Sequence, residues 1–167
     1  MAINFPWTLL IWDQTTSSPK HKDSPKYLRH DGPRLMKCIQ INLRHSKIAS
    51  AALAQVLLDL NFDVALIQEP YAYSATVPVL ANIPSGFSLF HKLTDDHAYG
   101  TAILVRDSFS HSATLSSTGP PNLSTCVRVS TRSGSLCLCS AYLRPSLTDF
   151  SHTVLAILDS FATPLCQ

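Results

Sequence analysis

The sequence predicts an α/β domain with several strands and two main helices. Residues 37–67 show a strand pattern, a helix pattern and a second strand pattern in that order. Further strand-like runs follow between residues 87 and 143, and a second helical pattern covers residues 150–161. With 167 residues, of which 46% are hydrophobic and 14% charged, the chain is long and apolar enough to form one folded domain. The net charge of +2 neither requires nor excludes a nucleic-acid partner.

The chain divides near Met36 into a disordered or irregular leader, residues 1–35, and a partial domain, residues 36–167. Residues 13–35 are polar, contain three prolines and one glycine and show no periodicity, as is typical of a linker. Their basic side chains could contact a phosphate backbone, although a solvated segment is the simpler interpretation. No apolar run reaches the roughly 20 residues of a membrane span, and the apolar start lacks the basic residues and cleavage site of a signal peptide.

The partial domain begins with a strand, a helix and a strand. Residues 37–42 alternate between apolar and polar side chains, and residues 64–67 form the short apolar run of a strand buried on both faces. Residues 46–60 have helical spacing. The expected apolar stripe of this helix comprises Ile48, Ala49, Ala52, Leu53, Val56, Leu57 and Leu60, and the expected outer face comprises Lys47, Ser50, Gln55 and Asp59. Such a crossover predicts two parallel, neighbouring strands.

The second part of the domain is rich in strand patterns. Further strands are predicted at residues 87–91, 100–105, 125–130 and 135–143, with turns at Gly100 and Gly134. Residues 146–149 resemble a capping box that opens the second helix, over residues 150–161. The five cysteines show neither a CxxC pair nor zinc-ligand spacing, which favours free, buried thiols in a reducing compartment.

Polar side chains follow the first two predicted strands. Asn42 ends the first strand and Glu69 follows the second. Because parallel neighbouring strands end at the same edge of a sheet, these two side chains are expected to lie side by side there. An amide oxygen beside a carboxylate suits Mg²⁺ or Mn²⁺. The alternative is that Glu69 is a solvated strand end and Asn42 a turn former.

Four blocks in order carry a resemblance to a known family. They are "IQINLRHS" at 39–46, "DVALIQEPY" at 63–71, "GTAILVRD" at 100–107 and "SAYLRPS" at 140–146. Together they look like the endonuclease domain of non-LTR (LINE-type) retrotransposons, over roughly residues 37–163. That domain is similar to apurinic/apyrimidinic endonucleases and belongs to the endonuclease/exonuclease/phosphatase superfamily. The resemblance implies an α/β sandwich with outer helices, here truncated to about one sheet with two main helices.

The resemblance also implies roles for individual residues. Asn42 matches a catalytic asparagine that lies near the scissile phosphate and also binds DNA. Tyr142 matches an active-site tyrosine that holds the phosphate. Glu69 matches the metal-binding glutamate, with Mg²⁺ or Mn²⁺ as cofactor. Arg144 matches a position where relatives carry a residue that lies near DNA. The implied activity is nicking of target DNA to prime reverse transcription. An intact element would carry a reverse transcriptase domain on the same chain and act inside the cell, in the nucleus.

Two blocks that the resemblance requires are absent from the sequence: an Asp-x-Asn block on the strand after the second helix and, later, a Ser-Asp-His block. The chain is therefore expected to be inactive alone, with one sheet face left uncovered. Two alternatives remain open, a phosphoesterase of another branch of the superfamily and a non-catalytic DNA-binding half-domain. The second would use the leader and other basic side chains: Arg44, Arg106, Arg128, Arg132 and Arg144. His91, Asp95, Asp96 and His97 are interpreted as a polar loop, and His45 is expected near the strand ends.

Overall fold

The described part of the chain forms two stacked sheets with helical residues outside them. The structure is a computed structural model that describes residues 10–11, 36–73, 76–94, 100–110, 112–116, 122–131, 134–143, 151–152 and 154–157. The helix α1 is Lys47–Asp59, and residues 151–152 and 154–157 are also helical. The strands are β1 (Leu10–Ile11), β2 (Cys38–Asn42), β3 (Val64–Gln68), β4 (Ala72–Tyr73), β5 (Val79–Leu80), β6 (Phe87–His91), β7 (Thr101–Arg106), β8 (Ser112–Leu115), β9 (Ser124–Thr131) and β10 (Gly134–Ala141).

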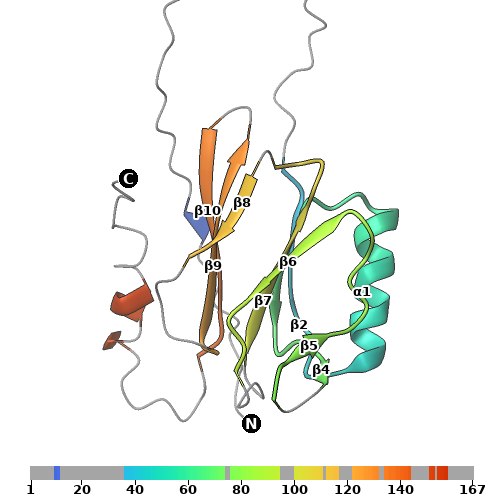
Figure 1. Ribbon diagram of the computed structural model, residues 1–167, viewed down its shortest axis with the longest axis horizontal. Helices are drawn as coiled ribbons and strands as arrows, with labels where there is room; N and C mark the ends of the chain where they lie inside the picture. Colours follow the sequence, from blue (N-terminus) through green and yellow to red (C-terminus); the bar gives the residue numbers. More distant parts are fainter. Residues whose placement is uncertain are drawn as a thin grey trace, which may run out of the picture.

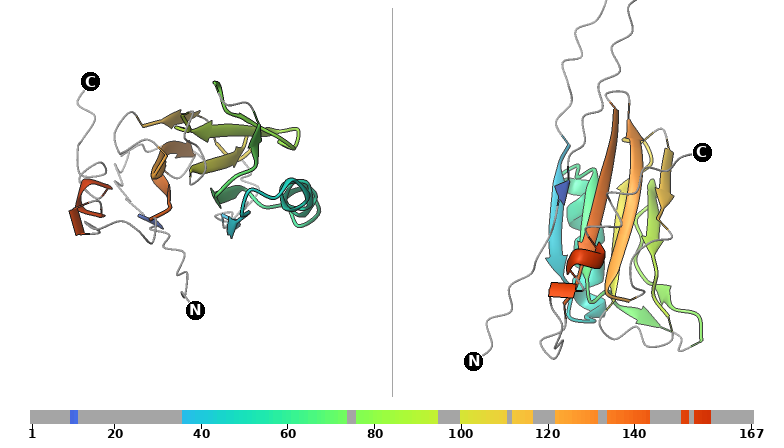
Figure 2. Two further views of the ribbon diagram at one scale, coloured as in Figure 1. Left: turned by 90° about the horizontal axis from the view of Figure 1, so that it is seen from below. Right: turned by 90° about the vertical axis from the view of Figure 1, so that its left-hand side faces the viewer.

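The first sheet has the strand order β2-β3-β7-β6 and the second β1-β10-β9-β8, while β4 and β5 form a small hairpin. Strands β2 and β3 are parallel, as the crossover pattern predicts, and the other pairs are antiparallel. Figure 1 shows α1 on the outer face of the first sheet and the second sheet on its other face. The helical residues near the C-terminus lie beyond the second sheet, and the two views of Figure 2 agree with this order of layers. None of the helices in the described residues is long and apolar enough to cross a membrane.

The helix α1 packs on the first sheet through a narrower face than the sequence predicts. Ser46 caps its N-terminus, because the Ser46 Oγ accepts a hydrogen bond of 3.2 Å from the Ala49 N–H. Leu53 and Leu57 are buried as expected, whereas Ile48 is 83% exposed and Leu60 is 56% exposed. Ser50, expected on the outer face, is buried, and its hydroxyl donates to the Ser46 carbonyl. A serine that bonds its own helix backbone can face the core without leaving an unpaired donor.

The central strand β3 explains why the first sheet needs a cover on both faces. All five of its residues are buried. Ala65 and Ile67 belong to the cluster that includes Leu53 and Leu57 of α1. Its alternate residues, Val64 and Leu66, pack in a separate cluster on the opposite face. The continuous apolar run therefore reflects burial between a helix layer and a second sheet.

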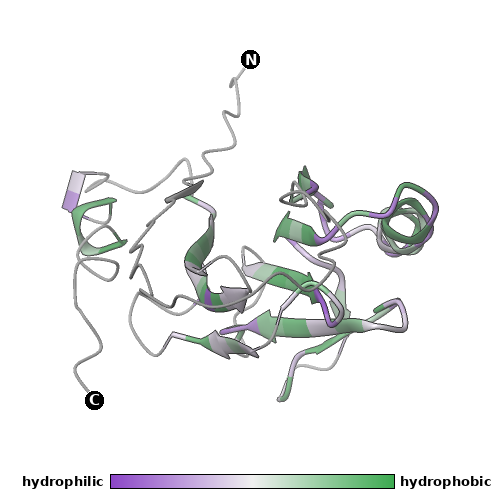
Figure 3. Ribbon diagram, turned by 90° about the horizontal axis from the view of Figure 1, so that it is seen from above, coloured by the Kyte–Doolittle hydropathy of each residue, from purple (hydrophilic) through white to green (hydrophobic). Residues whose placement is uncertain are grey.

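That second sheet corrects the expectation of about one sheet with an uncovered face. The sandwich class is confirmed, but the described residues already form both layers. Val127, Val129 and Leu138 of the β9–β10 pair are fully buried and pack against the inner side chains of β3 and β7. Figure 3 shows that green, hydrophobic colouring covers much of the strands in both sheets. Burial of this apolar area drives the two sheets together, so the chain covers its own inner sheet face.

Arg106 ties the first sheet to the end of α1. Its Nε donates to the Phe62 carbonyl at 2.8 Å, and its Nη2 donates to the Leu57 carbonyl at 2.9 Å. The guanidinium carbon lies 4.6 Å from the centre of the Phe87 ring, in a cation–π arrangement. Arg106 is thus committed to the fold, which removes it from the basic residues expected to contact DNA.

The described cysteines, Cys38, Cys126, Cys137 and Cys139, are free thiols as predicted, but Cys38 and Cys137 are only half-buried. Cys126 and Cys139 face each other across the β9–β10 pair with their sulfurs 3.2 Å apart. They are buried together with Ile157, one of the helical residues within the predicted second helix. The hydrogen bond with Cys126 and the burial of the site raise the pKa of the Cys139 thiol, so Cys139 is packed as a neutral thiol.

The leader adds one short strand to the second sheet. Leu10 pairs with Leu138 and Ile11 with Cys137, which places β1 at the edge of β10. The rest of the leader, including its basic residues, lies outside the described residues, as do Arg132 and Cys166. The division between leader and domain at residues 35 and 36 remains a prediction.

Candidate phosphate and metal site at the strand ends

Three strands end at the same edge of the sandwich. Asn42, the last residue of β2, pairs with Gln68, the last residue of β3. Across the gap between the sheets, the Gln68 Nε2 donates to the Ala141 carbonyl at 2.6 Å. Because Glu69 follows Gln68 and Tyr142 follows Ala141, one hydrogen bond brings both strand ends together. We call this edge, with Asn42, Glu69 and Tyr142, the strand-end site.

Glu69 has a backbone conformation that is unusual for a residue other than glycine. Its φ is 46°, in the left-handed region, which costs energy for an L-residue with a β-carbon. Backbone hydrogen bonds of 2.9 Å hold it on both sides: the Glu69 N–H donates to the Gly100 carbonyl, and the His45 N–H donates to the Glu69 carbonyl. Glu69 is only 9% exposed. A strained backbone that is held by hydrogen bonds and carries an acidic side chain at a strand end is a reason to look for function there.

Asn42 is oriented by the turn that follows it. Its Oδ1 accepts a hydrogen bond of 2.8 Å from the Arg44 N–H, while Arg44 and His45 have φ values of 47° and 55°. The amide oxygen expected to bind a metal is therefore already used in the turn. This geometry favours the amide Nδ2 as the functional atom, since it can donate to a phosphate oxygen without adding charge.

Tyr142 lies on the second sheet above a polar layer that joins the two sheets. It is 7% exposed, and its N–H donates to the Leu123 carbonyl at 2.8 Å. Beneath it, the Ser140 hydroxyl donates to the Ile67 carbonyl at 3.0 Å. The hydroxyls of Thr101 and Thr125 are 2.9 Å apart. These buried bonds cross between the sheets, so the strand-end site has a rigid, hydrogen-bonded floor.

A divalent cation fits this site through Glu69, whose carboxylate is a hard oxygen donor. Among the described residues, no group of three or more His, Cys, Asp or Glu side chains could hold a metal ion. Mg²⁺ is commonly bound through one or two carboxylates together with water and phosphate oxygens. The donor set therefore suits a cation that is completed by its substrate better than a closed structural metal centre.

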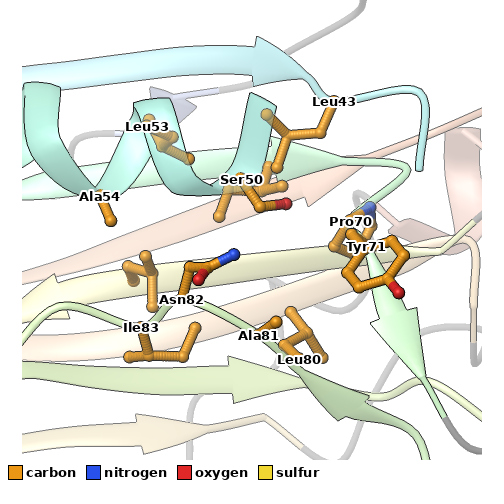
Figure 4. A pocket seen from close by; sticks show the side chains of 12 residues that line it. Leu43, Ser50, Leu53, Ala54, Pro70, Tyr71, Leu80, Ala81, Asn82 and Ile83 are labelled. Carbon is orange, nitrogen blue, oxygen red and sulfur yellow. The ribbon is translucent and has the colours of Figure 1, made fainter. Parts of the chain in front are cut away.

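A small cavity lies behind the strand-end site, between α1 and the segment that follows β5. Figure 4 shows Pro70 and Tyr71 at one end of it and Ala54 and Ile83 at the other. Its volume is about 10 Å³, which is enough for about one water molecule. The lining is mainly apolar, and Glu69 is not part of it. The cavity is thus a packing defect in the core and not a binding site for a phosphate ester.

The structure brings together most, though not all, of the residues selected from the sequence. Asn42 ends a strand, Glu69 and Tyr142 each follow one, and these strand ends meet. His45 lies beside Glu69 as expected. Arg144 lies outside the described residues, as do Asp95, Asp96 and His97. Sequence reasoning missed Gln68, whose only signal was a polar residue at the end of an apolar strand.

Comparisons with known proteins agree with this geometry. A profile of the endonuclease/exonuclease/phosphatase family matches residues 39–150. Among solved structures, the chain is similar to the "endonuclease domain of TRAS1, a telomere-specific non-LTR retrotransposon", with 26% identity and a TM-score of 0.54. That match covers 72% of this chain and 52% of the TRAS1 domain, so the chain corresponds to about half of that domain. No curated protein sequence gives a significant match. The resemblance identified from the four sequence blocks is confirmed.

Proposed function

The chain belongs to the endonuclease/exonuclease/phosphatase family, and from this premise we propose that it carries part of the active site of a retrotransposon DNA endonuclease. The activity would be divalent-metal-dependent hydrolysis of one phosphodiester bond in target DNA. The 3′-hydroxyl left by such a nick would prime reverse transcription. The similarity to the solved retrotransposon domain supports this branch of the family over a phosphoesterase of small substrates.

The observation that carries the proposal is the convergence of Asn42, Glu69 and Tyr142 at one edge of the sandwich. Each residue directly ends or follows a strand, so its position is set by the sheet and not by a long loop. The hydrogen bond from Gln68 to Ala141 holds the two sheets together at that point. A rigid framework of this kind suits catalysis, because preorganised groups need not reorganise in the transition state.

The chemistry assigned to each residue follows from its atoms. A divalent cation bound by Glu69 would neutralise negative charge on the phosphoryl oxygens. The Asn42 amide Nδ2 would donate to a phosphate oxygen, and the Tyr142 hydroxyl would donate to another. We assign Arg144 to contact with the DNA backbone, where a planar guanidinium suits phosphate. Mg²⁺ is the proposed cation, with Mn²⁺ as the alternative.

The partners and location belong to the same proposal. The substrate would be DNA, the complete element would carry a reverse transcriptase domain, and its work would take place in the nucleus. The sequence after the second predicted helix contains neither the Asp-x-Asn block nor the Ser-Asp-His block that the resemblance places there. We therefore propose that this chain alone does not nick DNA, because a general base and a histidine for the phosphate are missing.

The alternative of a non-catalytic DNA-binding module receives no support from the described arginines. Arg106 is bonded within the fold, Arg44 lies beside the strand-end site, and Arg128 is half-buried in the second sheet. They lie in three different parts of the sandwich, and a DNA-binding face requires a continuous patch.

Two assays on the wild-type chain, Glu69→Gln and Asp59→Asn test the proposal. Asp59 is exposed at the end of α1, so Asp59→Asn is a control that removes one charge far from the site. Water-proton relaxation with Mn²⁺ should report binding to the wild type and to Asp59→Asn, but not to Glu69→Gln. Equal Mn²⁺ binding by all three proteins would reject Glu69 as a metal ligand.

Nicking of a supercoiled plasmid with Mg²⁺ tests the second part of the proposal. No nicking is expected from any of the three proteins. Nicking by the wild type that disappears in Glu69→Gln would support the endonuclease assignment but refute the statement that the chain is inactive alone. Nicking that persists in Glu69→Gln would indicate another site or a contaminating nuclease.

A further inference from the structure

We propose that His45 is a positioning residue whose imidazole locks the turn after Asn42 to the turn after Glu69. The inference rests on the proposed function of the strand-end site, because it concerns how two of its side chains are held. It assigns no contact with substrate to His45. It predicts instead that the His45 ring sets the geometry of the carboxylate.

Three hydrogen bonds join the two turns. The Leu43 N–H donates to the Gln68 carbonyl and the His45 N–H to the Glu69 carbonyl, each at 2.9 Å. The His45 Nδ1 is 3.3 Å from the Pro70 carbonyl oxygen. The first two use the backbone, so any residue except proline could make them. The third requires a donor at the δ position of the side chain.

The identity of residue 45 is informative because its backbone disfavours a side chain. With a φ of 55°, this position would suit glycine or asparagine better than histidine. The ring is also exposed, so burial of apolar area does not explain it. The contact with Pro70 is the interaction that compensates for the strained backbone. Two further left-handed residues, Arg44 and Glu69, belong to the turns that this contact joins.

The contact also determines the state of the ring. A carbonyl oxygen only accepts hydrogen bonds, so the His45 Nδ1 must carry the proton. In the neutral ring this is the Nδ1–H tautomer, with Nε2 as a lone-pair acceptor. Free histidine favours the other tautomer, and the structure therefore predicts a spectroscopic signature that a histidine without this contact would lack.

The test uses two substitutions at residue 45 and Mn²⁺ as the probe. His45→Gly relieves the backbone and removes the ring, whereas His45→Asn tolerates positive φ and keeps a donor, Nδ2, at the δ position. Removal of a residue that orients a metal ligand typically costs about 10–100-fold in affinity. We expect Mn²⁺ binding to weaken about tenfold in His45→Gly and to stay within about threefold of the wild type in His45→Asn.

The pattern across the two variants decides the role. Weaker Mn²⁺ binding in His45→Gly, together with binding close to that of the wild type in His45→Asn, supports the proposed positioning role of His45. Equal loss in both variants overturns it, because the ring would then act through Nε2. No loss in either also overturns it. Urea unfolding of both variants ensures that the comparison is made between folded proteins.

A second measurement separates this inference from the proposed function. Nitrogen-15 chemical shifts of the wild-type His45 ring, recorded at alkaline pH without metal, should show the Nδ1–H tautomer. If that tautomer is present while Glu69→Gln still binds Mn²⁺ normally, the lock stands and the metal role of Glu69 fails. If the Nε2–H tautomer dominates, the lock is wrong whatever Glu69 binds.

Discussion

Replacing Arg106 with methionine should destabilise the fold without touching the strand-end site. Methionine keeps an unbranched apolar stem of similar length, so packing beside Phe87 is largely retained. Both hydrogen bonds of the guanidinium are lost. The Leu57 carbonyl keeps the hydrogen bond of 3.1 Å that it accepts from the Phe62 N–H. The main loss is therefore the hydrogen bond from Arg106 to the Phe62 carbonyl.

The expected size of the effect follows from these contacts. A hydrogen bond from a charged donor contributes about 1.5–3 kcal/mol net, and the lower end applies to a half-exposed side chain. The second bond counts for less, because its acceptor keeps another donor. The cation–π contact with Phe87 adds about 0.5–1 kcal/mol. We expect Arg106→Met to lower the free energy of unfolding by about 3 kcal/mol, a large share of the roughly 5–15 kcal/mol typical of a domain.

Urea unfolding followed by circular dichroism would measure this loss. With a slope of about 1–3 kcal/mol per molar urea, the midpoint should fall by about 1–2 M. Arg128→Met, at a half-buried arginine of β9, is the matched control and should change stability by less than about 1 kcal/mol. A loss below about 1 kcal/mol for Arg106→Met, or an equal loss for both variants, would refute the role assigned to Arg106.

Three further predictions concern the two sheets and the strand ends. Glu69→Gly should be more stable than Glu69→Ala by about 1 kcal/mol in urea unfolding, reversing the usual order, because φ is positive there; a more stable alanine variant would contradict this backbone. Gln68→Leu should lower the free energy of unfolding by about 1–2 kcal/mol and speed hydrogen exchange of the Tyr142 amide, because it removes the hydrogen bond to the Ala141 carbonyl. Unchanged exchange would show that this hydrogen bond does not hold the two sheet ends together. Burial raises the pKa of the Cys38 thiol from 9.0 to about 11. Between these two pH values the thiol is therefore protonated in the folded state and ionised in the unfolded state. The stabilisation is present below pH 9 and is lost as pH rises toward 11; the urea midpoint should fall more steeply over that window in the wild type than in Cys38→Ala, and parallel curves would exclude Cys38 as the cause.

The sequence by itself determined the main elements and the pairing that builds the site. The strand and helix bounds expected from periodicity lie within two residues of those observed for β2, α1, β3, β6, β7, β9 and β10. Asn42 and Glu69 were expected to lie close together because a strand–helix–strand crossover joins parallel neighbouring strands. The parallel pairing of β2 with β3 confirms this expectation. Short edge strands such as β8 carried too weak a pattern to be recognised.

Only the tertiary structure decided which sheet each strand joins and which polar groups are used in the fold. An apolar run shows that a strand is buried on both faces, but it does not identify what covers it; β9 and β10 therefore appeared to belong to the first sheet. The bond between Gln68 and Ala141 joins residues 73 positions apart, and the commitment of Arg106 likewise depends on distant carbonyls. The left-handed backbone of Glu69 is set by bonds to Gly100 and His45. Local patterns report only neighbours along the chain, whereas these features come from groups that meet after the chain has folded.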